Sequence, residues 1–240
     1  MLKAYFPVDV RADYATFDIQ CGTIRRATHA NTSWDAAKHE VFGHKFCDIS
    51  EARFGVALLN DSKYGYSVRD CNMGLSLLKA PKFPDHEADM GHHSFVYSLL
   101  PHDRPLEDSP VFDEAHRLNT PLWVAILDRP SEPEQYLMAR DAINNQRFLE
   151  IDQPNVVVGA LKRSEDSENV FILRVHEDRG EHVCTKIKFG PELIVKSVVV
   201  VNSLEEEWVE HAGLAVFDQE KQEIMLDIRA YKIITLALHI

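Results

Sequence analysis

Residues 58–67, LLNDSKYGYS, bring together side chains that could hold a polar ligand. A short apolar run ends in a polar turn that carries Asp61, Lys63 and Tyr64 before a glycine. Asn, Asp and Gly are typical of tight turns, and glycine accepts a positive φ without strain. Carboxylates, cations and aromatic faces also bind hydroxyl-rich ligands such as sugars. Two interpretations are therefore open, an ordinary exposed turn, which the residues alone favour, and a ligand-binding loop.

A second segment, PDHEADMGHHSFVYSLLPHD, mixes imidazoles with carboxylates, as metal sites do. Its histidines are His86, His92, His93 and His102. Their spacing matches no helical H-x-x-x-H pair and no compact zinc motif. The adjacent His92 and His93 would also point to opposite faces of a strand. We interpret the segment as a polar loop that leads into a strand, and we predict no metal site in it.

Other reactive residue types give weaker signals. His176 and Asp178 could share one face of a strand, but Asp178 also begins an Asp-Arg-Gly run typical of a hairpin turn. Residues 203–211 are interpreted as a solvated acidic stretch, and Cys71 as an inert thiol. The sequence has no G-x-S-x-G, Walker or G-x-G-x-x-G motif, and it cannot show whether two carboxylates are paired as in a glycosidase. We predict no catalytic residue in the chain.

The elements that must position these residues are mostly strands, because apolar and polar residues alternate with period two. Strands are expected at residues 14–20, 38–46, 54–60, 73–79, 93–100, 155–163, 169–177, 192–202, 222–230 and 232–240. Helices are expected only at residues 110–119 and 132–145. This pattern predicts sandwiches of antiparallel sheets. We place a domain boundary between residues 152 and 153, giving domains 1–152 and 153–240. Because a β-like segment begins directly after Met1, we expect the first domain to be N-terminally truncated.

Composition limits the partners. The chain has 240 residues and a net charge of -12 with neutral histidines, so its field repels phosphate backbones and nucleic acid is not expected to bind. No apolar stretch approaches the roughly 20 residues that span a bilayer, and the N-terminus lacks a signal-peptide core. The four cysteines are widely spaced, which indicates free thiols in a reducing, cytoplasmic compartment.

Long segments of the chain resemble a known family. The stretch NDSKYGYSVRDCNMGLSLLKAPKFPDHEADMGHHSFVYSLLPH is similar to the C-terminal region of glycoside hydrolase family 38 α-mannosidases, in the cytosolic, vacuolar and bacterial branch. FPVDVRADYATFDIQCGTIRRATHANTSWDAAKHEVFGHKFCDISEARFGVALL resembles the part just before it, and FLEIDQPNVVVGALKRSED and EIMLDIRAYKIITLALHI resemble the last part. The resemblance implies an all-β chain with a large antiparallel β-sandwich (a supersandwich, galactose mutarotase-like), followed by a smaller C-terminal β-sandwich.

The resemblance also implies a function in mannose metabolism. In this family an N-terminal barrel carries a zinc ion, an aspartate nucleophile and an acidic proton donor for retaining hydrolysis of α-mannosides of oligosaccharides. Only the β part is represented here. We therefore expect no cofactor in this chain, no activity by the chain alone, and the barrel and a mannose-containing oligosaccharide as its partners.

In such enzymes a loop of the large β domain reaches towards the active site, which implies that Asp61, Lys63 and Tyr64 lie at the rim of the sugar site. The lysosomal and Golgi branches have an arginine after the corresponding aspartate. Here Ser62 and Lys63 follow Asp61, so that contact cannot be transferred by identity.

Two alternatives remain. The chain could be a stand-alone carbohydrate-binding module, with Trp34, Trp123 and Trp208 available to stack on sugar rings, although core packing is favoured for each tryptophan. It could instead serve as a structural or oligomerisation module that supports the barrel or forms a homo-oligomer through apolar surface.

Overall fold

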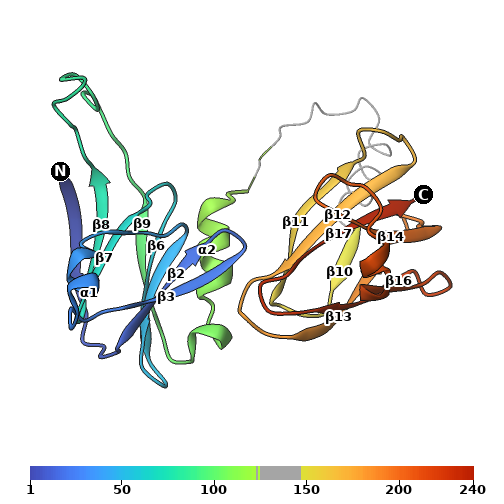
Figure 1. The fold of residues 1–240 in the computed structure, drawn as a ribbon, viewed down its shortest axis with the longest axis horizontal. Helices are drawn as coiled ribbons and strands as arrows, with labels where there is room; N and C mark the ends of the chain where they lie inside the picture. The colour runs from blue at the N-terminus through green and yellow to red at the C-terminus, as the bar shows by residue number, and fades with distance from the viewer. Residues whose placement is uncertain (123, 125–146) are drawn as a thin grey trace, which may run out of the picture. The chain divides into compact units, whose positions relative to one another are not determined.

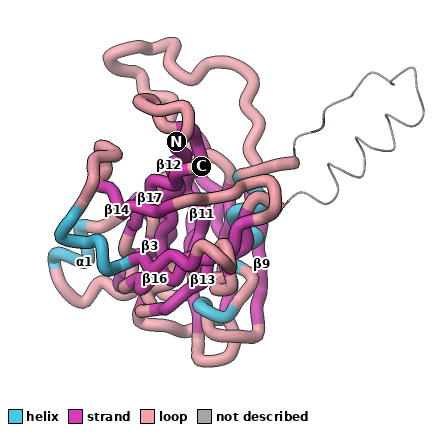
Figure 2. Tube along the Cα trace, turned by 90° about the vertical axis from the view of Figure 1, so that its right-hand side faces the viewer, coloured by secondary structure: helices cyan, strands magenta, loops and turns pink. Residues whose placement is uncertain are grey.

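The computed structural model describes residues 1–122, 124 and 147–240. The chain divides into two compact units, Met1–Trp123 and Val124–Ile240 (Figure 1). Each unit consists mainly of antiparallel strands, and Figure 2 shows short helices between them. The predicted all-β sandwich class is therefore confirmed. No helix in the described part of the chain is long and apolar enough to cross a membrane.

The first unit contains two sheets, which have the strand orders β1-β8-β7-β4 and β3-β2-β5-β6-β9. Three short helical segments accompany them: α1 (Ser33–Ala37), η1 (Leu106–Asp108) and α2 (Val111–Asn119). The strands are β1 (Leu2–Pro7), β2 (Tyr14–Ile19), β3 (Gly22–Ala27), β4 (Val41–Phe42), β5 (Phe46–Ser50), β6 (Gly55–Asn60), β7 (Gly65–Arg69), β8 (Asn72–Leu78) and β9 (Tyr97–His102).

The core of the first unit lies on both faces of the five-stranded sheet. One face packs on the four-stranded sheet, and β5 contributes Cys47 and Ile49 to this cluster. The other face is covered by α2, so the alternate β5 residue Phe46 contacts Phe112, with ring centroids 5.2 Å apart. Strand β6 is buried along its whole length because it has core on both sides. This explains its continuous apolar run, which ends at the polar turn.

The second unit is a smaller sandwich of two four-stranded sheets, with the orders β11-β12-β17-β14 and β10-β13-β16-β15. A hydrophobic core lies between the two sheets and includes Leu173, Ile187, Ile224 and Leu236. The strands and the 3-10 segment are β10 (Leu149–Ile151), β11 (Val156–Arg163), β12 (Val170–Glu177), β13 (Val183–Phe189), β14 (Ser197–Val201), η2 (Val209–Leu214), β15 (Ala215–Asp218), β16 (Glu223–Ile228) and β17 (Ile233–His239).

Several expected elements differ in the structure. The strand expected at residues 38–46 is broken: β4 has two residues, and the next strand begins only at Phe46. The hairpin expected at Asp178 is wrong, because β12 and β13 lie in different sheets and the intervening residues cross between them. Helix α2 confirms the helix expected at residues 110–119, whereas the one expected at residues 132–145 lies outside the described residues.

The expected domain boundary stays a prediction. It falls between residues 152 and 153, just after β10. In the structure β10 pairs with β13, so residues 149–151 belong to a sheet of the second unit.

Candidate functional site

The turn between β6 and β7, residues 60–64, is built around a buried asparagine and is called the Asn60 turn below. Asn60 is 1% exposed, and its Oδ1 accepts the backbone N–H groups of Ser62, at 3.0 Å, and of Lys63. An asparagine that bonds the backbone two and three residues ahead imposes a turn at once. The following residues are therefore fixed by the chain itself.

A buried hydrogen-bond network supports this turn from below. The Asn60 Nδ2 donates to the carbonyl of His44 at 3.0 Å and to the hydroxyl of Tyr66, which in turn donates to the same carbonyl at 3.0 Å. Tyr66 is fully buried, and burial raises the pKa of its phenol well above the ordinary value of 10.0, so this hydroxyl remains a donor. The end of α2 joins the network, because Asn119 donates to the Asn60 carbonyl at 2.9 Å.

The three predicted ligand-binding residues lie on this support. Asp61 is exposed, and the hydroxyl of Ser62 donates to its carboxylate at 3.0 Å. Lys63 is half-buried, with its ammonium 4.5 Å from the ring centroid of Phe95. Tyr64 is 61% exposed. The turn thus carries one carboxylate, one ammonium and one largely exposed aromatic ring, and Lys63 and Tyr64 contact different neighbours, Phe95 and His44.

The neighbouring strands hold Tyr64 in a defined position. Its carbonyl accepts the N–H of Gly43 at 3.0 Å, and its ring lies edge-on to His44 with centroids 5.6 Å apart. The N–H of Asp61 also points to the Val96 carbonyl, at 3.4 Å, across from the start of β9. Such a preformed polar surface can bind hydroxyl groups, because an ionised carboxylate accepts, an ammonium donates and a flat ring packs on C–H groups.

Comparisons with known proteins show that two parts of the chain match protein-family models. Residues 1–87 match the family model "Glycosyl hydrolases family 38 C-terminal domain", and residues 155–236 match "Glycosyl hydrolases family 38 C-terminal beta sandwich domain". The two matches together show a C-terminal region of glycosyl hydrolases family 38.

Relatives in this family carry the name α-mannosidase. Alpha-mannosidase G of Dictyostelium discoideum is 39% identical over 209 residues, which are 86% of this chain and 18% of the relative. Alpha-mannosidase 2C1 of Homo sapiens is 42% identical over 184 residues, which are 76% of this chain and 17% of the relative. The chain thus spans less than a fifth of the length of these curated relatives.

The fold has a counterpart among solved structures. The crystal structure of an alpha-mannosidase from Enterococcus faecalis V583 matches 98% of this chain and 25% of its own, with a TM-score of 0.71 and 17% identity. At that identity the likeness supports the fold alone. The resemblance to the C-terminal region of family 38 is confirmed by these comparisons together with the family models.

The histidines of residues 84–103 do not gather in this family 38 domain. His86, His92 and His93 are exposed in the connection that projects between β8 and β9 in Figure 1, and the His93 Nε2 contacts the backbone carbonyl of Asp89 at 2.8 Å. His102 instead turns into the five-stranded sheet. Among the residues that the structure describes, no group of three or more His, Cys, Asp and Glu side chains could hold a metal ion.

His102 is part of a buried pair. Its Nε2 lies 2.8 Å from the carboxylate of Asp48, its Nδ1 lies 2.8 Å from the Arg104 carbonyl, and the Ser50 hydroxyl donates to Asp48. The hydrogen bond to Asp48, working against burial, raises the pKa of His102 above its ordinary value of 6.5. The Asp48–His102 pair connects β5 to β9 across the intervening strand β6, so its role is structural.

The remaining candidates, His176 and Asp178, lie on either side of a buried carboxylate that has a structural role. His176 lies in β12 and Asp178 in the crossing that follows, and between them Glu177 is fully buried. The Glu177 carboxylate accepts the backbone N–H groups of Arg179, Gly180 and Tyr231, each at 2.9 Å. Burial would raise the pKa of Glu177, but these N–H donors outweigh it and lower the pKa. No sequence motif signals this contact between two loops.

The tryptophans differ from one another. Trp34 is 80% exposed, so the expected core packing is wrong for it; α1 has only five residues and none of them is buried. Trp208 is half-buried, with its ring 3.9 Å from that of His211, and Trp123 lies outside the described residues. In the acidic stretch, Glu205 is half-buried and pairs with Lys162 at 2.7 Å, whereas its neighbours Glu206 and Glu207 are exposed.

Proposed function

We propose that this chain is the C-terminal β-sandwich portion of a zinc-dependent, retaining α-mannosidase that acts on terminal α-mannosides of oligosaccharides. The catalytic barrel belongs to the rest of a longer polypeptide, which accords with the small share of each relative that the chain spans. The Asn60 turn completes the rim of the mannoside site, and the chain alone does not hydrolyse sugars.

The observation that carries this proposal is the preformed Asn60 turn within the family 38 match. The carboxylate of Asp61 would accept hydrogen bonds from two neighbouring sugar hydroxyls, the ammonium of Lys63 would donate one, and the ring of Tyr64 would pack on the apolar face of the sugar. Because the buried network fixes the turn before the ligand arrives, little ordering entropy is lost on binding.

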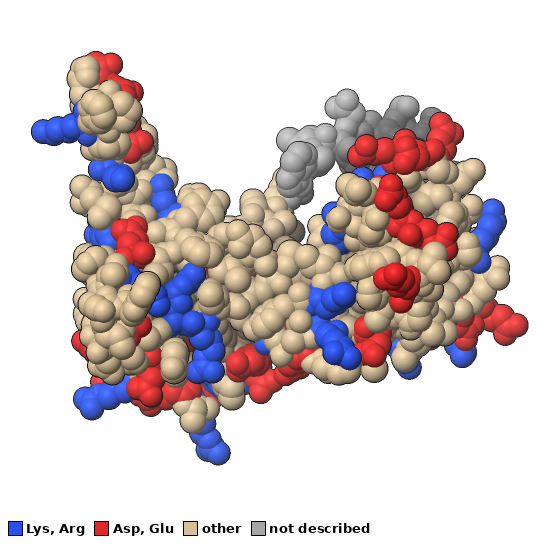
Figure 3. Space-filling model, viewed as in Figure 1, with Lys and Arg blue, Asp and Glu red and all other residues tan. Residues whose placement is uncertain are grey.

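Zinc does not fit the described residues, since no suitable group of ligand side chains gathers among them. We propose that the metal binds to the barrel, and no step is assigned to it here. We also infer a cytoplasmic location, which the four unpaired cysteines support because reducing compartments keep thiols free. Acidic and basic side chains are interspersed on the face that Figure 3 shows, which accords with the absence of nucleic acid from the proposed partners.

The test is Asp61→Ala in the longer polypeptide that carries this chain, with hydrolysis of 4-nitrophenyl α-mannoside as the assay. Loss of a hydrogen bond to a charged group should lower kcat/KM by about tenfold or more. Asp166→Ala is the matched control, because this aspartate is exposed on the second unit. An unchanged kcat/KM for Asp61→Ala would refute the proposed role of the turn.

A further inference from the structure

A cleft of about 330 Å³ opens in the first unit at the opposite end of β7 from the Asn60 turn. Six residue steps separate Tyr64 from Asp70, which at about 3.3 Å per residue places the two features roughly 20 Å apart. The volume lies at the small end of the range for ligand pockets, and it suits one sugar ring rather than a chain. The lining residues are Val10, Arg11, Ala12, Asp13, Thr28, His29, Asp70 and Cys71.

Backbone hydrogen bonds preform this cleft. Its three walls are the segments after β1 and β3 and the turn between β7 and β8. The N–H of Thr28 donates to the backbone carbonyl of Asp13 at 3.0 Å, and the hydroxyl of Thr28 donates to the backbone carbonyl of Ala12 at 2.6 Å. The N–H of Asp70 donates to the backbone carbonyl of Thr28 at 3.0 Å. The buried Thr28 thus links all three walls, so the cleft needs no rearrangement to accept a ligand.

The polar groups of the cleft are both donors and acceptors. Asp13 and Asp70 are exposed, and neither carboxylate bonds to another side chain in the described part of the protein. Arg11 also lines the cleft. The Nδ1 of His29 is buried without a hydrogen-bond partner among the described residues, and the nearest carboxylate oxygen, from Asp35, is 3.9 Å away.

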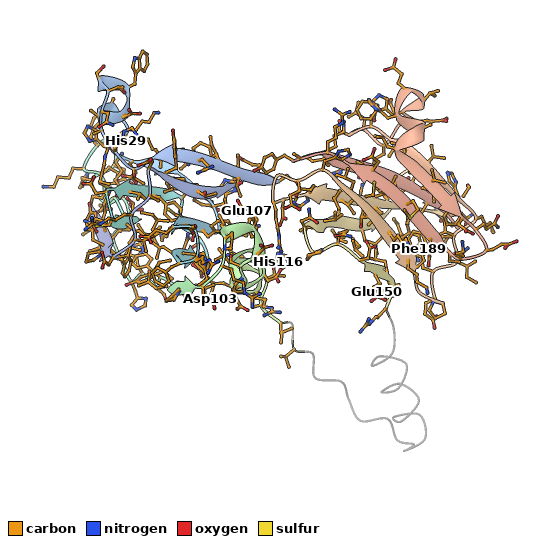
Figure 4. All side chains as sticks on the ribbon, turned by 90° about the horizontal axis from the view of Figure 1, so that it is seen from below. His29, Asp103, Glu107, His116, Glu150 and Phe189 are labelled. Carbon is orange, nitrogen blue, oxygen red and sulfur yellow. The ribbon has the colours of Figure 1, made fainter. Side chains whose placement is uncertain are left out.

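An exposed indole lies in the segment that follows His29. Arg69 donates to the carbonyls of His29, at 3.1 Å, Asp35, at 2.8 Å, and Lys38, at 3.1 Å, and so fastens residues 29–38 to the end of β7. Trp34 precedes Asp35 in this fastened segment and is 80% exposed. In Figure 4 His29 lies on the side of the first unit that carries α1, away from Asp103.

We propose that this cleft is a second saccharide-binding site, which takes a single hexose unit through Asp13, Asp70 and Arg11, with Trp34 as a flanking stacking ring. A sugar hydroxyl both donates and accepts, so it matches a lining of two carboxylates and one guanidinium. An anion would be repelled by the two carboxylates, and the described residues gather no set of metal ligands. Tryptophan is the ring best suited to cover the apolar face of a sugar.

The experiment is a titration of the 240-residue chain with methyl α-mannoside, followed by ¹H–¹⁵N NMR. The expected result is saturable shifts at residues 10–13, 28–29 and 70–71, with a dissociation constant on the order of 1 mM, as is usual for so small a ligand. Asp70→Asn should weaken binding about tenfold. Asparagine tolerates the positive φ of 51° at this position, so the fold should persist.

Asp166→Asn is the control variant, because this aspartate is exposed on the second unit and has no role in either proposed site. Binding that survives Asp166→Asn and weakens in Asp70→Asn and Trp34→Ala supports the proposal. Shifts that are absent at tenfold the expected constant overturn it, as do saturable shifts confined to residues 60–64. The kinetic test of Asp61 in the longer polypeptide is separate, so either proposal can fail without the other.

Discussion

Replacing Asn60 by alanine should destabilise the Asn60 turn. The side chain accepts two backbone N–H groups and donates to the His44 carbonyl and the Tyr66 hydroxyl. Alanine removes all four hydrogen bonds and leaves a small void at a site that is 1% exposed. Water can reach the two turn N–H groups, and the His44 carbonyl keeps the hydroxyl of Tyr66 as a donor.

The expected magnitude follows from these partners. With net contributions of about 0.5–1.5 kcal/mol for each bond, and with compensation for those that remain solvated or paired, the loss should be about 2–4 kcal/mol. Tyr66→Phe removes only the hydroxyl and leaves Asn60 bonded to His44 and to the turn, so it should cost about 1 kcal/mol.

The assay is urea unfolding of the 240-residue chain, combined with amide hydrogen exchange to assign the loss to a unit. Exchange at residues 55–69 should accelerate strongly in Asn60→Ala, while the second unit should keep its wild-type protection. The reasoning is refuted if Asn60→Ala costs no more than Tyr66→Phe, or if the turn amides keep their protection.

Two pH-dependent predictions concern buried ionised groups. Because the pKa of Glu177 is lowered from 4.5, its stabilising contribution is present above pH 4.5 and is lost as the pH falls through the folded-state pKa. Glu177→Gln should lower the free energy of unfolding of the second unit by about 2 kcal/mol at neutral pH. The urea midpoint of that unit should then decline less on acidification than in the wild type. Because the pKa of His102 is raised from 6.5, its contribution is present below that pH and is lost as the pH rises through the folded-state value. Asp48→Asn should remove this alkaline decline in the stability of the first unit, and a decline that persists would contradict the assignment to His102.

The sequence predicts best where a local residue pattern is enough to determine the structure. The alternation in β12 and the apolar runs of β6 and β17 predicted strands close to those observed. Strand β7 was missed because it has only five residues and begins directly after the polar turn. The turn itself could be predicted, since an asparagine at the end of an apolar run is typical of one.

The partners of these residues could not be predicted, because they come from distant parts of the chain. His102 lies among histidines that suggest a metal, yet the register of β5, β6 and β9 places it on Asp48, 54 residues earlier. Asn119 reaches the turn only because α2 packs on β6. The exposure of Trp34 likewise depends on where a short helix lies and not on its own residue type.

The central claim is that this chain contributes recognition and fold to an α-mannosidase while the chemistry occurs elsewhere. The most direct measurement is hydrolysis of 4-nitrophenyl α-mannoside by the 240-residue chain, with zinc or cobalt added and with a chelator control. The account predicts no release above the blank under any of these conditions. Metal-dependent release would contradict it and would place catalytic groups within these 240 residues.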